Sequence, residues 1–137
     1  VRVTPVQDLV LRWIPAMLVE PLYQRLAAAG LGLADAGTIA DVTSCPGAES
    51  CRLAVTQSRG LGRLLGEHLR ARQDLVDAAP DVHIKISGCF NACGQHHIAD
   101  IGFFGSSRRI GTHVARIEAE RKGKRVEPLA RLDQKRD

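Results

Sequence analysis

Two pairs of cysteines are the residues of this chain whose types and spacing point most directly to chemistry. Five residues separate Cys45 from Cys51, three separate Cys89 from Cys93, and the chain has no other cysteine. Each pair lies in a short turn that contains glycine, and four thiolates gathered in this way are the donor set of a zinc ion or an iron–sulfur cluster. Zinc ligands in one turn usually have about two to four residues between them. The wider first gap therefore favours the separated corners of a [4Fe–4S] cluster.

The hydrophobic pattern places both cysteine pairs directly after predicted strands. Residues 38–44 and 82–86 alternate or cluster apolar side chains in the manner of short strands, and residues 98–104 are predicted to form a third. Helices are predicted for residues 18–29, 48–58 and 61–76, with glycines at their ends. Ligands commonly bind at the edge of an α/β sheet where its strands end. We therefore expect Cys45 and Cys89 to lie at one such edge.

Length and composition describe an ordinary globular domain. The chain has 137 residues, of which 45% are apolar and 25% charged, enough for one hydrophobic core. No apolar run approaches the roughly 20 residues of a membrane-spanning helix, and the N-terminal residues lack the pattern of a secretory signal. We therefore expect a cytoplasmic protein without a membrane partner, in which the thiols stay reduced and act as ligands rather than as disulfides.

The net charge of +4 comes from the C-terminal part of the chain. Residues 106–137 hold ten Lys and Arg against five Asp and Glu, whereas the preceding residues hold nine against ten. This segment has no Phe, Trp or Tyr, so the stacking side chains of nucleic-acid-binding proteins are missing. We expect a solvated or disordered basic tail and no nucleic-acid partner.

The sequences around both cysteine pairs resemble the signature of the sirohaem-containing nitrite and sulfite reductases. The stretch from Ser87 to Phe103, SGCFNACGQHHIADIGF, is similar to the second cysteine motif of the family's assimilatory, ferredoxin-dependent branch. The stretch from Thr43 to Leu53, TSCPGAESCRL, is similar to the first, including its five-residue gap. Residues 1–31 resemble the small ferredoxin-like half-domain that precedes the cluster domain. The resemblance covers residues 1–105 and then stops.

The resemblance implies an α+β fold: a ferredoxin-like segment followed by an α/β layer like the 4Fe-4S domain of nitrite and sulfite reductases. The corresponding division is a ferredoxin-like half-domain segment over residues 1–36 and a [4Fe–4S]/sirohaem-binding domain over residues 37–105. Residues 106–137 remain as the basic tail. The family's enzymes are several times longer, and the cations that clamp their substrate lie largely in a repeat with no counterpart here. We therefore expect a fragment or a truncated member that is incomplete for catalysis.

The resemblance also implies roles for individual residues. The four cysteines would hold one [4Fe–4S] cluster, and Cys93 would in addition reach the iron of a sirohaem, which makes it the candidate catalytic residue. Asn91, Arg52 and His96 are candidate cofactor-binding residues, because an amide or an imidazole can donate to a cofactor edge and arginine pairs strongly with carboxylates. Each of these three also fits an ordinary turn, surface or packing role.

The implied function is that of the cofactor-binding part of an assimilatory nitrite or sulfite reductase. Electrons would pass from the cluster through Cys93 to sirohaem for the six-electron reduction of nitrite to ammonia or of sulfite to sulfide. Ferredoxin is the expected donor and a flavoprotein the runner-up, with a small inorganic anion as substrate. Three alternatives stay open: a non-enzymatic iron–sulfur electron-transfer domain, a fragment of a related corrin-pathway oxygenase, and a zinc-stabilised binding module.

Overall fold

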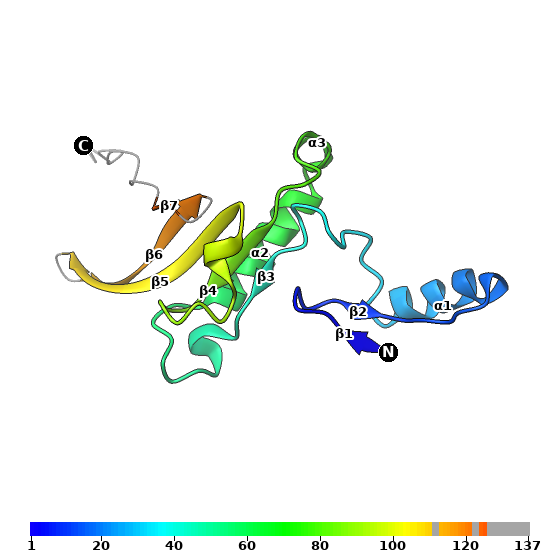
Figure 1. Ribbon diagram of the computed structural model, residues 1–137, viewed down its shortest axis with the longest axis horizontal. Helices are drawn as coiled ribbons and strands as arrows, with labels where there is room; N and C mark the ends of the chain where they lie inside the picture. The colour runs from blue at the N-terminus through cyan, green and yellow to red at the C-terminus, as the bar shows by residue number, and fades with distance from the viewer. Residues whose placement is uncertain (111–112, 122–123, 126–137) are drawn as a thin grey trace, which may run out of the picture.

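The structure is a computed structural model, which describes residues 1–110, 113–121 and 124–125. Its N-terminal part consists of a short antiparallel pair, β1 (Arg2–Val3) and β2 (Leu9–Val10), followed by helix α1 (Ala16–Ala28). In Figure 1 these elements lie to one side of the larger part, which is built on a mixed sheet. Within the described residues, no helix is both long and apolar enough to cross a membrane.

The larger part is a five-stranded sheet with two helices in one crossover. The strands, in the order in which they pair, are β3 (Thr43–Ser44), β4 (Ile84–Ser87), β5 (Ile101–Ile110), β6 (His113–Arg121) and β7 (Lys124–Arg125). The pairs β3–β4 and β4–β5 are parallel, and the other two are antiparallel. Parallel neighbours need a long connection. Helices α2 (Ser58–Arg70) and α3 (Gln73–Ala78) lie in the connection from β3 to β4. The connection from β4 to β5 carries Cys89 and Cys93.

The hydrophobic core lies between α2 and the sheet. Ile84 and Ile86 of β4 are buried together with Leu69 of α2 and with Ile39 and Ala40 before β3. Successive side chains of a strand point to opposite faces, so the two remaining β4 residues face away from this core. All four β4 residues are nevertheless buried. The second face of β4 is therefore covered as well, and it lies beside the cysteine loop.

The stretch predicted as a helix over residues 48–58 is instead a loop, and the prediction was wrong there. A short 3-10 turn, η1 (Gly47–Glu49), is followed by non-helical backbone up to Gln57. The N–H groups of Val55 and Thr56 both donate to the carbonyl oxygen of Gly88, at 2.9 and 3.1 Å. Donors engaged by a distant carbonyl cannot close helical turns. The predicted break between helices, at Gly60 and Gly62, also fails, because α2 runs through both.

The sheet continues past residue 105, so the expectation of an unpacked basic tail is wrong for residues 106–110, 113–121 and 124–125. The register of β5 with β6 runs from Ile101 opposite Arg121 to Ser107 opposite Ala115. The sequence of β6 alternates small or apolar residues with charged ones, as a half-buried strand does. The count of basic residues concealed this alternation. Residues 111–112, 122–123 and 126–137 of the predicted tail lie outside the described residues.

The side chain of Gln7 joins the N-terminal part to the edge of β3 through two hydrogen bonds. The Nε2 of Gln7 donates to the carbonyl oxygen of Ser44 at 2.8 Å, and the N–H of Ser44 donates to Oε1 of Gln7 at 3.2 Å. The hydroxyl of Thr43 also donates to the carbonyl oxygen of Val6 at 3.4 Å. The amide group of Gln7 thus takes the place of a neighbouring strand, one residue before Cys45.

We expect Gln7→Ala to lower the free energy of unfolding by about 1 kcal/mol, because it removes two hydrogen bonds on an exposed edge. The measurement is the urea midpoint of the chain. Gln24→Ala is the matched control, since Gln24 donates at 2.6 Å to Glu20 on the surface of α1, and its loss should change stability by less than about 0.5 kcal/mol. Equal urea midpoints for the two variants would show that the hydrogen bonds of Gln7 to Ser44 do not stabilise the chain.

Candidate metal centre

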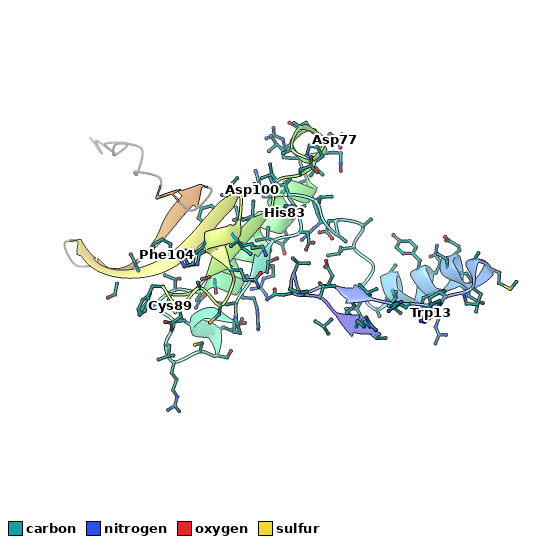
Figure 2. The ribbon with its side chains drawn as sticks, in the orientation of Figure 1. Trp13, Asp77, His83, Cys89, Asp100 and Phe104 are labelled. Atoms are coloured by element: carbon teal, nitrogen blue, oxygen red, sulfur yellow. The ribbon has the colours of Figure 1, made fainter. Side chains whose placement is uncertain are left out.

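The first cysteine of each pair follows directly on a strand, as predicted. Cys45 comes immediately after β3, and its N–H donates to the carbonyl oxygen of Ile86 at 3.1 Å, which extends the ladder with β4. Cys89 lies two residues beyond Ser87, the last residue of β4. Because β3 and β4 are parallel neighbours, both cysteines lie at the same edge of the sheet. Figure 2 shows Cys89 at that edge and His83 and Asp100 at the opposite one.

Gly88 holds the first cysteine loop against the second. Besides accepting two hydrogen bonds from the loop that follows Cys51, Gly88 donates its own N–H to the Sγ of Cys45 at 3.1 Å. The approach is close: a Cβ placed on Gly88 would lie 2.8 Å from the Cα of Gly47 and 2.9 Å from the Cβ of Ala54. Glycine is required at this position. The two cysteine motifs, far apart in sequence, are therefore in direct contact.

The second cysteine loop turns back onto the end of β4. The N–H of Gly94 donates to the hydroxyl oxygen of Ser87 at 3.1 Å, and a Cβ on Gly94 would overlap the carbonyl group of Ile86. Ala92 and Gln95 both adopt positive φ, 58° and 60°, which non-glycine residues seldom do. This tight reversal returns the chain to the strand directly after Cys93.

The four thiols differ in their exposure. Cys45 and Cys89 are each 7% exposed, Cys51 is half-buried and Cys93 is exposed. The sulfur of Cys93 has a weak contact with the carbonyl oxygen of Asn91 at 4.0 Å, a distance at the outer limit for a thiol donor. The set therefore has a buried side, formed by the first cysteine of each pair, and one cysteine that faces outward.

The donor set fits an iron–sulfur cluster. In the part of the chain that the structure describes, no three side chains of His, Cys, Asp or Glu are grouped so that they could hold one metal ion. Zinc needs its four sulfurs at about 2.3 Å from a single ion, whereas each thiolate ligand of a [4Fe–4S] cluster binds a different iron. Thiolate sulfur is the donor that binds each iron of such a cluster, so the chemistry of the four cysteines fits a [4Fe–4S] cluster.

The three predicted cofactor-binding residues lie in the two cysteine loops, with different surroundings. Arg52 and Asn91 are exposed, each beside a cysteine or between two of them. His96 is 1% exposed, with its Nδ1 at 2.8 Å from the hydroxyl of Ser87 and its ring stacked on Phe104 at a centroid distance of 4.9 Å. His96 therefore packs between Ser87 and Phe104, while Arg52 and Asn91 face outward.

Several buried polar residues beside the cysteines were not singled out from the sequence. Ser58, at the start of α2, is 0% exposed and touches Cys45. On the second face of β4, Lys85 is 7% exposed and its Nζ donates to the Oε1 of Gln95 at 2.8 Å. The partners of Ser58 and Lys85 are at least ten residues away along the chain. Local sequence patterns therefore carried no signal for them.

Comparison with known proteins identifies the family. Residues 35–117 match the family model described as "Nitrite and sulphite reductase 4Fe-4S domain". A protein named sulfite reductase [ferredoxin], from Mycobacterium tuberculosis, is 36% identical over 107 residues, which cover 77% of this chain and 19% of the relative. A ferredoxin–nitrite reductase from Synechococcus elongatus is 32% identical over 124 residues, covering 86% of this chain and 23% of the relative.

The fold is also that of a solved relative. The structure of the NirA protein of Mycobacterium tuberculosis matches with a TM-score of 0.72 and 31% identity, over 86% of this chain and 22% of that one. The chain therefore spans about a fifth of the length of the relatives that it matches.

These comparisons confirm the α+β fold and the resemblance seen in the sequence, and the family match reaches beyond residue 105 into β6. The description of the matched family model also names the predicted [4Fe–4S] cluster. The chain belongs to the nitrite and sulphite reductase 4Fe-4S domain family.

Proposed function

We propose that this chain is the cofactor-binding part of an assimilatory nitrite or sulfite reductase. The observation that carries the proposal is the meeting of both cysteine motifs at the shared edge of β3 and β4, where Gly88 bonds to Cys45 and to the loop after Cys51. When bound, the cluster and sirohaem supply the electron transfer that reduces nitrite to ammonia or sulfite to sulfide. The protein's part is to hold, orient and shield these groups.

In this proposal the four cysteines have different roles, which depend on how far each is exposed. Cys45 and Cys89 would hold the cluster on its buried side, with the half-buried Cys51 beside them. Cys93 holds it on the exposed side, so its sulfur is the one that a second, larger cofactor can approach. We therefore assign Cys93 as the ligand shared by the cluster and the iron of sirohaem.

The candidate cofactor-binding residues contribute in two ways. Arg52 and Asn91 are exposed beside the cysteines, where a guanidinium can pair with the carboxylates of sirohaem and an amide can donate to its edge. His96 is buried and acts through Ser87, whose hydroxyl also anchors Gly94. The role of His96 in this proposal is to hold the loop that keeps Cys93 on the exposed side of the site.

Ferredoxin is the proposed electron donor. Two of the relatives, one a sulfite and one a nitrite reductase, carry ferredoxin in their names, and the cysteine motifs resemble the same branch. The names include both substrates, so the proposal covers a small anion of either kind. A cytoplasmic location stays a prediction, which rests on the need to keep four thiols reduced.

The proposal predicts the metal content of the purified chain. We expect about four acid-labile sulfides per chain, at least as many irons, and a sirohaem absorption band after anaerobic purification with sirohaem supplied. Iron and sulfide without that band would favour the electron-transfer alternative. Stoichiometric zinc, or four thiols that take up neither iron nor zinc, would overturn the proposal.

A further inference from the structure

The hydroxyl of Ser58 is enclosed beside Cys45. Ser58 is the first residue of α2 and is 0% exposed. Its hydroxyl donates to the carbonyl oxygen of Cys45 at 2.9 Å and lies 3.2 Å from the sulfur of the same residue. A Cβ placed on Gly47 would come within 2.5 Å of this hydroxyl oxygen. The serine therefore sits in a tight space, closed to solvent, between the first cysteine turn and the helix.

The sulfur of Cys45 has a second polar neighbour, the N–H of Gly88, which donates to it at 3.1 Å. Both contacts are buried, and hydrogen bonds away from water are stronger than exposed ones. The exposed Cys93 differs, since its sulfur lies 4.0 Å from the carbonyl oxygen of Asn91, an acceptor rather than a donor. Of these two sulfurs, only that of Cys45 has donors arranged around it.

The protonation state of Cys45 decides what the hydroxyl of Ser58 does. A thiol can donate to the oxygen of Ser58 while the hydroxyl proton goes to the carbonyl oxygen. A thiolate bound to iron has no proton and can only accept. The hydroxyl proton can then turn to the sulfur, because hydroxyl rotors take the direction that suits their partners and the distance is already 3.2 Å.

We propose that Ser58 is a positioning residue that donates a hydrogen bond to the Cys45 thiolate and so raises the reduction potential of the bound cluster. One-electron reduction adds one negative charge to the cluster and its thiolates, and a donor aimed at a ligand sulfur stabilises that charge. Hydrogen bonds to the sulfurs are among the factors that set cluster potentials. This inference rests on the proposed function, in that it takes Cys45 as a cluster ligand.

The test is a redox titration of the full chain loaded with its cluster, with dithionite as the reductant. We expect Ser58→Ala to lower the cluster's reduction potential while iron and sulfide stay at the level of the unchanged chain. Ser50→Ala is the matched control, because Ser50 is an exposed serine between the same two cysteines; it should leave the potential unchanged. Ser58→Thr keeps a hydroxyl and should stay close to the unchanged chain.

An unchanged potential in Ser58→Ala, or equal shifts in Ser58→Ala and Ser50→Ala, would overturn the inference. If Ser58→Ala does not retain its cluster, Ser58→Thr decides: retention with an unchanged potential supports a role for the hydroxyl, whereas loss in both overturns it. Failure of the proposed function is seen in the unchanged chain instead, as missing iron and sulfide or as a missing sirohaem band, and neither result depends on Ser58.

Discussion

Cys93→Ser is expected to abolish the binding of sirohaem while part of the [4Fe–4S] cluster remains, whereas Cys45→Ser is expected to cost mainly the cluster. The reason is the difference in their surroundings. Cys45 is 7% exposed and its sulfur is contacted by Gly88 and Ser58, so a replacement there disturbs the buried side of the centre. Cys93 is exposed and is the proposed shared ligand, so its loss removes the link to the second cofactor.

Visible spectra together with iron and sulfide analysis, on anaerobically purified variants with sirohaem supplied, measure this difference. In Cys93→Ser the sirohaem band should fall to background, while sulfide persists at a measurable fraction of the unchanged chain. In Cys45→Ser the sulfide content should show the larger loss. If both variants lose both cofactors in the same proportion, the division of roles between buried and exposed cysteines is wrong.

Gly94→Ala is expected to lower the free energy of unfolding by about 3 kcal/mol or more and to prevent cluster loading. An added Cβ would overlap the carbonyl group of Ile86 in β4. Backbone atoms of a buried strand cannot move aside as a flexible side chain can, and overpacking of this kind is costly. The same shift would disturb the hydrogen bond from Gly94 to Ser87 and move the adjacent Cys93.

Gly60→Ala is the control for this substitution. Gly60 lies inside α2, and the nearest atom to an added Cβ is the side-chain Oε1 of Gln57 at 3.6 Å, an ordinary contact. Alanine favours a helix interior over glycine by roughly 0.5–1 kcal/mol, so Gly60→Ala should equal or exceed the unchanged chain in stability. Urea midpoints give the comparison, with iron content as a second readout. A Gly94→Ala variant as stable as Gly60→Ala would contradict the close approach.

The loop from residue 50 to 57 shows why the sequence pattern predicted a helix that the structure does not contain. Its composition suggested a helix, but its N–H groups bond to the carbonyl oxygen of Gly88, a partner more than thirty residues away. The β5–β6 hairpin was missed for a different reason. Its pairing depends on the partner strand, and the excess of basic residues obscured the alternation in β6. The first error concerns a loop whose backbone partner is distant in sequence, whereas the second concerns two consecutive strands whose alternation the charge count obscured.

Around the cysteines, too, some features could be predicted from the sequence and others depended on the folded chain. The sequence determined the donor set, the order and spacing of the two motifs, the family and the α+β class, because these depend on residue types and on short-range periodicity. It also placed Cys45 and Cys89 after strands, which local alternation reveals. Only the tertiary structure decided that Ser58 contacts Cys45, that Gln7 hydrogen-bonds to Ser44 of β3, and that Cys93 is the exposed cysteine. These features are contacts between segments distant in sequence, or the result of how such segments pack, and no local pattern specifies them.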